Sequence, residues 1–349
     1  MKTLTITRPD DWHLHLRDGA ALAAVAGFSA RQFGRAVVMP NLQPPVTTVE
    51  SAARYRQRIL AALPPGSGFV PLMTLYLTDI TPPGEIDRVS AGSFMCGVKY
   101  YPAGATTHSA AGVTSLTRCL GVLERMEELD VVLQLHGEST DAGDDPYDRE
   151  AHFIERELVP LVRRFPGLRM VLEHVTSSAG VEFVRAQGPR VAATLTPQHL
   201  LLNRGAMFDG GLRPHLYCLP LLKRERDREA LVAAATSGDP RFFLGTDSAP
   251  HARDAKESGC GCAGVFSAHA AIELYAQAFE QAGALGRLEG FASHHGADFY
   301  RLPRNAGTLT LTRDGWSVPA TYPFGDGEVV PLLAGERLAW SMAPTDAKA

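Results

Sequence analysis

The chain has 349 residues, of which 45% are hydrophobic and 21% are charged, and its formal net charge is -4. This composition is typical of globular proteins, and the absence of a basic excess disfavours a nucleic-acid-binding protein. No apolar run is long enough for a signal peptide or a membrane span, which predicts a cytoplasmic protein. The five scattered cysteines form no CxxC pair and predict reduced thiols.

The first predicted element is the short run "WHLHL" at 12–16. In an extended strand alternate residues share a face, so His13, His15 and Arg17 are predicted to point one way. Trp12, Leu14 and Leu16 are predicted to point the other way. By themselves, the two histidines are equally consistent with an ordinary exposed strand face.

Seven more apolar runs follow in chain order, each rich in the residues of buried parallel strands. They span 35–41, 69–78, 96–102, 131–138, 169–175, 191–201 and 242–251. Amphipathic helices are predicted between strands at 115–129, 149–164 and 267–283, with a shorter one around 177–187. Eight strands that alternate with helices predict an α/β protein of the (β/α)8 TIM barrel type. The alternative, a doubly wound open sheet, lacks its GxGxxG signal after the first strand.

Beyond residue 300 the sequence is typical of short strands and turns rather than of a further helix pair. We therefore expect one barrel domain over residues 1–349. Within it, residues from about 303 to 349 are expected to form a small C-terminal extension packed on the barrel.

The tail ends of the predicted strands hold residues with ligand or ionisable side chains. Because the carboxyl ends of barrel strands meet at one mouth, these side chains are expected to share a pocket. Any one of the histidines is more simply read as a core residue, and Asp247 as a helix N-cap, but four such strand ends are a poor fit to chance. Imidazoles and a carboxylate suit zinc, and their number exceeds what one tetrahedral ion uses, which favours two metals. The residues are His13, His15, Asn41, Lys99, His136, His174, Asp247 and His251.

Lys99 has two interpretations in such a pocket. An ammonium beside two dications is repelled, and burial lowers a lysine pKa, so the amine could be neutral and add carbon dioxide. The resulting carbamate is an anion able to bridge two metals. Alternatively, Lys99 points away and binds a substrate anion as a point charge. Spacing alone leaves both interpretations open.

Several longer motifs resemble the bacterial single-chain dihydroorotases, within the amidohydrolase superfamily, and the resemblance covers residues from about 3 to 340. HxH by itself marks only the superfamily, whereas the lysine stretch and the GTDSAPH segment are specific. One departure is His108, where a smaller residue such as Asn is expected. The motifs are "HLHLRD", "MPNLQPP", "GVKYYPAGATTHS", "QLHGE", "LEHVT", "GTDSAPH" and "KESGCGCAG".

The resemblance implies two zinc ions, bridged by Lys99 as N6-carboxylysine and by hydroxide. His13, His15, Asp247 and Lys99 would bind the more buried ion, and Lys99, His136 and His174 the other. It also implies three kinds of substrate contact. Arg17, Asn41 and His251 would hold the substrate carboxylate, and the backbone of Leu219 and Ala263 would contact the ring. Thr106 and Thr107 would lie on a mobile loop that closes over the substrate.

The implied reaction is the reversible hydrolysis of (S)-dihydroorotate to N-carbamoyl-L-aspartate in pyrimidine biosynthesis, with Asp247 as general base and acid. The resemblance also implies a homodimer. The alternative is another binuclear cyclic amidase of the hydantoinase or allantoinase kind. A mononuclear deaminase is disfavoured by Lys99, and an inactive assembly subunit is disfavoured because no ligand is missing.

Overall fold

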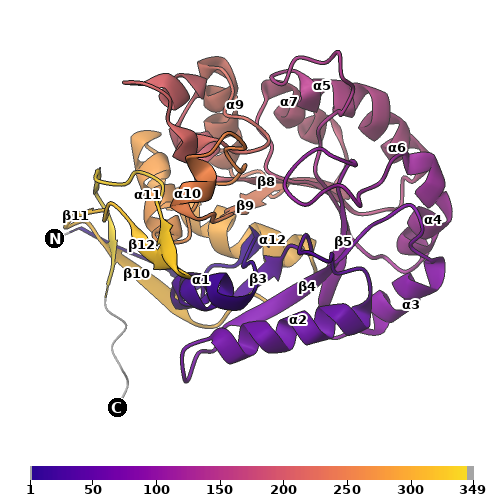
Figure 1. The fold of residues 1–349 in the computed structure, drawn as a ribbon, viewed down its shortest axis with the longest axis horizontal. Helices are drawn as coiled ribbons and strands as arrows, with labels where there is room; N and C mark the ends of the chain where they lie inside the picture. The colour runs from indigo at the N-terminus through magenta and orange to yellow at the C-terminus, as the bar shows by residue number, and fades with distance from the viewer. Residues whose placement is uncertain (1, 344–349) are drawn as a thin grey trace.

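The core of the structure, a computed structural model that describes residues 2–343, is a barrel of eight parallel strands. Each strand pairs with the next one along the chain, and helices surround them (Figure 1). The predicted (β/α)8 barrel is therefore confirmed. The strands are β2 (Asp11–Leu14), β3 (Arg35–Val38), β4 (Val70–Tyr76), β5 (Met95–Tyr100), β6 (Leu133–Leu135), β7 (Met170–Leu172), β8 (Val191–Leu195) and β9 (Phe242–Leu244).

Hydrogen bonds beyond the strand ends close the barrel between β9 and β2. The amide of Asp247 donates to the carbonyl of His13 at 2.9 Å, and the amide of His15 donates to the carbonyl of Ser248 at 3.1 Å. The Asp11 carboxylate also accepts the amide of Thr246 at 2.9 Å. This seam runs through residues of the predicted site, so closing the barrel also places them.

The helices lie mainly on the outside of the barrel, where their apolar faces and the outer faces of the strands form one large buried cluster. They are α1 (Gly19–Gln32), α2 (Val49–Ala62), α3 (Pro83–Ala91), α4 (Leu120–Glu128), α5 (Arg149–Phe153), α6 (Val159–Arg164), α7 (Ser178–Ala186), α8 (Pro197–Leu201), α9 (Glu225–Ala235), α10 (Arg253–Lys256), α11 (Ala271–Gln281) and α12 (His295–Phe299). Single turns of 3-10 or π helix are η1 (Leu116–Cys119), η2 (Ile154–Leu158), η3 (Arg204–Phe208), η4 (Pro214–Leu216), η5 (Leu285–Arg287) and η6 (Gly290–His294).

Three predicted helices differ from the structure in detail. The helix predicted at 115–129 starts as the 3-10 turn η1 and becomes α4 at Leu120. The one predicted at 149–164 widens into the π turn η2 just before Pro160, which has no N–H to donate to a carbonyl one turn back. The one predicted at 267–283 begins only at Ala271, because the amides of residues 267 and 268 donate to the Ser248 hydroxyl instead.

The first barrel strand also departs from simple alternation. Strand β2 ends at Leu14, its pairing with β3 shifts register, and Arg17 has a φ of 59°, so Arg17 does not continue the strand face. Trp12 packs inside the barrel, where its ring stacks on Tyr300 with centroids 4.6 Å apart. The prediction that Trp12 shares a face with Leu14 and Leu16 was therefore wrong, and the reason is the register shift. His13, His15 and Arg17 do line one cavity together.

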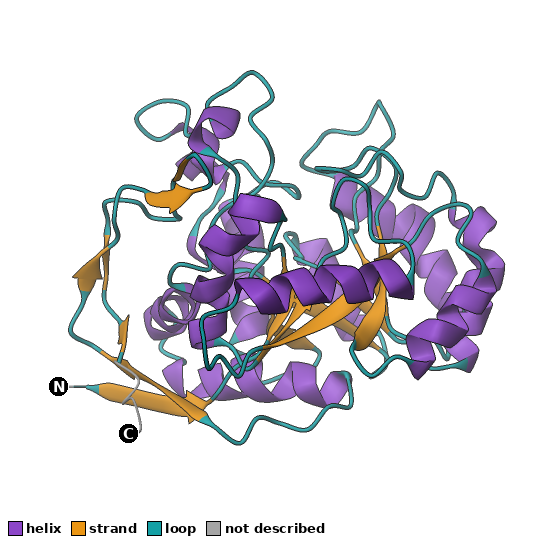
Figure 2. Cartoon of the chain, turned by 60° about the horizontal axis from the view of Figure 1, so that its bottom comes forward, coloured by secondary structure: helices purple, strands orange, loops and turns teal. Residues whose placement is uncertain are grey.

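The region after the barrel folds back onto the N-terminus, as the neighbouring strands at the edge of Figure 2 show. Strand β1 (Thr3–Thr7) pairs with β10 (Thr308–Thr312), which pairs with β15 (Ser341–Met342). Residues 344–349 of the expected extension lie outside the described residues. Within 2–343, no helix is long and apolar enough to cross a membrane. The other strands are β11 (Trp316–Ser317), β12 (Tyr322–Phe324), β13 (Gly327–Val329) and β14 (Arg337–Leu338).

Candidate active site

Five barrel strands bring the predicted metal ligands to the carboxyl end of the barrel. Strand β2 carries the first histidine and ends just before the second, and β5 carries the lysine. Strands β6, β7 and β9 end one to three residues before the other two histidines and the aspartate. All six side chains are buried, and they are His13, His15, Lys99, His136, His174 and Asp247.

Ligand atoms of these residues face one another in two groups. In the first, His15 Nε2 lies 3.1 Å from Asp247 Oδ1, and the Nε2 atoms of His13 and His15 lie 3.3 Å apart. In the second, His136 Nδ1 lies 3.2 Å from His174 Nε2. The rings of His13 and His174 are 4.9 Å apart between centroids, so the two groups adjoin. The structure therefore brings the predicted ligands together.

The other ring nitrogen of three of these histidines contacts an oxygen atom. An accepting oxygen holds the ring hydrogen on that nitrogen and leaves a lone pair on the nitrogen that faces inward. Such contacts fix both the orientation and the tautomer of a metal ligand. Each contact is 2.9 Å long: His13 Nδ1 to Glu173 Oε2, His15 Nδ1 to Asn41 Oδ1, and His136 Nε2 to Glu138 Oε2.

This donor set fits metal cations. With the ring hydrogens on the outer nitrogens, the inner nitrogens of His13 and His15 carry no hydrogen between them, and a cation would relieve their repulsion. Burial lowers the pKa of His13 and of His174 well below the ordinary value, so both rings are in the neutral form that a metal requires. Within residues 2–343 the Nζ atom of Lys99 has no hydrogen-bond partner although it is fully buried, which also indicates a missing group.

Asp247 is an ionised carboxylate in this setting. Its burial would raise the pKa, but the close contact with His15 and the neighbouring His13 and Lys99 side chains lower it to about 2. An ionised carboxylate can both ligate a cation and accept a proton.

Lys99 lies among the histidines. Its charge contributes to the lowered pKa of both His13 and His174, and its Nζ atom lies 5.0 Å from the centre of the Tyr101 ring. Burial lowers the pKa of Lys99 to about 8. A larger fraction of its amine is therefore neutral at physiological pH than for an exposed lysine, whose pKa is about 10.4.

A cavity opens beside the ligand cluster, and most of the predicted substrate-binding residues line it. His251 lies one layer further out, where its Nε2 atom is 2.9 Å from the Arg17 guanidinium and 3.0 Å from the carbonyl of Ala263. The expected carboxylate clamp is thus partly assembled around Arg17. The lining residues that the sequence predicts as substrate contacts are Arg17, Asn41, Thr106, Thr107, Leu219 and Ala263.

The loop that carries Thr106 and Thr107 closes over this cavity. The Thr107 hydroxyl donates to the carbonyl of Ala263 at 3.2 Å, and the Asn41 amide donates to the carbonyl of Thr107 at 3.1 Å. The space left in the cavity has a volume of about 20 Å³, enough for a water molecule. His108 in this loop has a φ of 56°, a region where Asn is favoured, which gives a physical basis for the residue expected there.

Backbone strain gathers at the same place. Arg17, His174 and Asp247 all have positive φ, at 59°, 41° and 45°. For a residue with a side chain such a conformation costs of order 1–3 kcal/mol, and the conformation persists only where the surrounding structure enforces it. Three strained residues around one cavity indicate that the backbone there is held in an unfavourable conformation in order to place these side chains.

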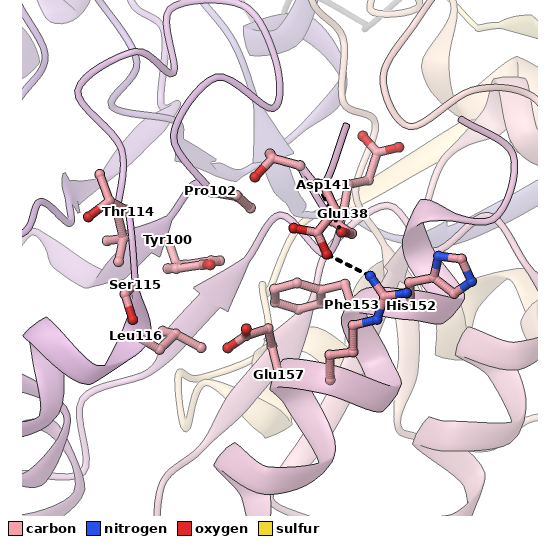
Figure 3. Close-up of a pocket in the computed structure, with 14 residues that line it drawn as sticks. Tyr100, Pro102, Thr114, Ser115, Leu116, Glu138, Asp141, His152, Phe153 and Glu157 are labelled. Atoms are coloured by element: carbon pink, nitrogen blue, oxygen red, sulfur yellow. Dashed lines mark hydrogen bonds and ion pairs between the residues drawn. The ribbon is translucent and has the colours of Figure 1, made fainter. Parts of the chain in front are cut away.

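Three residues of the site were missed from sequence. Glu138 and Glu173 hold ligand histidines, and Tyr101 lines the cavity. Two signals were available: Glu138 and Tyr101 each follow a predicted ligand by two residues, and Glu173 directly precedes His174. Glu138 also lines a second pocket, together with Tyr100 and Phe153 (Figure 3).

Comparisons with known proteins agree with this architecture. The Amidohydrolase family model matches residues 6–319. A dihydroorotase of Laribacter hongkongensis is 66% identical over 98% of this chain and 100% of its own length. Among solved structures, a dihydroorotase of Saccharomyces cerevisiae in complex with 5-fluoroorotic acid has a TM-score of 0.90 at 34% identity, covering 98% of this chain and 99% of that one. One from Campylobacter jejuni has a TM-score of 0.89 at 36% identity, covering 97% of each chain.

Proposed function

The chain belongs to the amidohydrolase family and, within it, to the dihydroorotases; on that premise we propose that it catalyses the reversible hydrolysis of (S)-dihydroorotate to N-carbamoyl-L-aspartate in pyrimidine biosynthesis. It is a hydrolase that acts on a cyclic amide. The observation that carries the substrate assignment is the Arg17 guanidinium on the same cavity as His13, His15 and Asp247. A guanidinium binds a planar carboxylate through two hydrogen bonds, and dihydroorotate bears one beside its ring nitrogen.

We propose two zinc ions per chain. His13, His15, Asp247 and Lys99 would hold one, and Lys99, His136 and His174 the other, with Lys99 carboxylated on Nζ as the shared ligand. The paired ring nitrogens and the unpartnered Lys99 amine support this assignment. Bound metal would supply Lewis-acid stabilisation of negative charge and would lower the pKa of a water molecule.

The chain's own groups move the proton. Asp247 accepts a proton from the attacking water and returns it to the ring nitrogen as the carbon–nitrogen bond breaks. In ring closure the same carboxylate acts in reverse order. Hydrolysis also creates a new carboxylic acid that ionises, so the equilibrium shifts toward ring opening as pH rises and toward ring closure as it falls.

Substrate choice separates this function from the alternative, a hydantoinase or allantoinase. Hydantoin has no carboxylate to pair with Arg17, which the Pro250 carbonyl and His251 hold in place. The test is turnover of dihydroorotate, hydantoin and allantoin by one preparation, with metal content per chain measured on the same sample. Faster turnover of hydantoin than of dihydroorotate would defeat the proposal.

Replacing Thr107 with alanine tests the loop. The variant loses the hydroxyl that donates to Ala263 and so weakens closure, and we expect slower turnover at unchanged metal content. Steady-state kinetics and metal analysis measure the two effects. Thr117, an exposed threonine on η1 outside the cavity, provides the control as Thr117→Ala. Loss of zinc from the Thr107 variant would mean that the loop serves the metals instead.

We further propose that the chain forms one domain and pairs as a homodimer in the cytoplasm. The antiparallel pairing of β1 with β10 supports a single domain, because it joins the N-terminal strand to the C-terminal extension. The family resemblance supports the dimer, and the five free cysteines suit a reducing compartment. Sedimentation equilibrium of the full chain measures the state of assembly, and a monomer at micromolar concentration would contradict the dimer.

A further inference from the structure

The hydroxyl of Tyr101 is an unsatisfied donor inside the site. The residue is 1% exposed, and its Oη atom has no hydrogen-bond partner among the residues that the structure describes. Buried hydroxyl groups in folded proteins are almost always paired, and the exceptions need a physical explanation. The adjacent Tyr76, by contrast, donates its own hydroxyl to the carbonyl of His108 at 3.2 Å, whereas the Lys99 amine beside Tyr101 is unpaired like the Tyr101 hydroxyl.

Tyr101 is one of the residues that line the proposed substrate cavity. Tyr101 follows Lys99 by two residues at the end of β5 and lines the cavity together with His136, His174 and Thr107. Its ring centroid lies 6.1 Å from that of His136. The donor therefore borders the space in which the cyclic amide must be attacked.

The ring of Tyr101 is held firmly in this position. It stacks on Tyr76 with centroids 5.1 Å apart and an interplanar angle of 30°, and the Lys99 amine lies over it. Tyr76 in turn is tied to the closed loop through His108. A donor that is already held in place needs little free energy to reorient when negative charge develops beside it. This is the condition for effective transition-state stabilisation.

We propose that Tyr101 is a catalytic residue that donates a hydrogen bond to the carbonyl oxygen of the cyclic amide as that oxygen becomes negative. The inference rests on the proposed function. Water forms a carbon–oxygen bond, and the carbonyl electron pair moves to the oxygen that Tyr101 contacts. The carbon–nitrogen bond then breaks, and the nitrogen takes the proton carried by Asp247. The Tyr101 proton stays on its phenol, whose ordinary pKa is about 10.

The test is Tyr101→Phe, which keeps the ring and its stacking on Tyr76 and removes only the hydroxyl. We expect kcat to fall by about 10²-fold, the usual effect of losing one such donor, with KM little changed. Metal content, melting temperature and the Kd for 5-fluoroorotic acid, the ligand named in the yeast structure, should match wild type. That compound is planar and unreactive, so it reports ground-state binding only.

Tyr100→Phe is the matched control. Tyr100 is the preceding residue, also buried, and its side chain lines the pocket on the other side of the strand (Figure 3). We expect it to keep wild-type kcat. Wild-type kcat in Tyr101→Phe would overturn the inference, as would parallel loss of metal, which would assign the hydroxyl to the metal centre. Failure of the wild-type enzyme to turn over dihydroorotate would instead refute the proposed function, and this inference with it.

Discussion

Replacing Asp247 with alanine is expected to abolish turnover in both directions while the fold survives. The side chain is the proton carrier of the proposed reaction, and general acid–base catalysis typically contributes 10²- to 10⁴-fold, about 3 to 5 kcal/mol of barrier. The same substitution removes the oxygen that lies 3.1 Å from His15 Nε2, so metal affinity should fall as well. Initial rates of ring opening and of ring closure, each at saturating substrate, measure the effect.

A second variant separates the two roles of Asp247. Asp247→Asn keeps the shape and one ligand oxygen but cannot accept a proton, so it should retain more metal than the alanine variant and remain nearly inactive. Asp10→Asn is the control, because Asp10 is an equally buried carboxylate whose partner is Arg35, outside the cavity. A substantial residual rate in Asp247→Ala with intact metal would remove this residue from the proton transfer.

Replacing Lys99 with alanine is expected to remove both metal and activity. If Lys99 is the anionic ligand shared by two cations, its loss leaves each with fewer ligands and restores mutual repulsion between them. The truncated side chain also leaves space at a fully buried position, into which a short carboxylate such as acetate can bind. We therefore expect added short carboxylates to restore part of the metal binding and part of the activity.

Lys99→Met provides the matched comparison, since its side chain fills the same space without an amine. It should lose metal to the same degree but gain nothing from added acetate. In the wild-type chain, ¹³C NMR after exposure to labelled bicarbonate should show a carbamate carbon that is absent from both variants. Full metal content in Lys99→Ala would disprove the shared anionic ligand.

The large effects expected for Asp247→Ala and Lys99→Ala follow from the side chains that hold the histidine rings in place. Glu173, Asn41 and Glu138 hold the outer nitrogens of three rings, so the inner nitrogens remain directed at a common space even without a cation. The Thr194 hydroxyl donates to Glu173 at 2.6 Å and extends this support to β8. Loss of a central ligand should therefore remove metal without collapse of the barrel mouth.

Much of the fold was accessible from the sequence alone. The eight apolar runs predicted eight buried strands, since strands covered on both faces need continuous hydrophobic residues. Ligand-type residues such as His136 and Asp247 lie in the last part of these runs, and the carboxyl ends of parallel strands necessarily converge in a barrel. Local pattern and this one topological rule were enough to group the candidate ligands, and the longer motifs indicated the reaction by resemblance.

Tertiary structure decided what local pattern does not encode. Glu173 acts on His13 across 160 positions, and the hydroxyl of Tyr101 is informative only because no partner reaches it. Arg17 reaches the cavity through a left-handed backbone rather than through strand alternation, since barrel closure at β2 and β9 dictates its place. The sequence alone located the strands and the residue types at their ends, because a hydrophobic run and the residues that close it are local features of the chain. Hydrogen-bond partners, strain and enclosure depend on distant segments meeting in space, and only the folded chain specifies them.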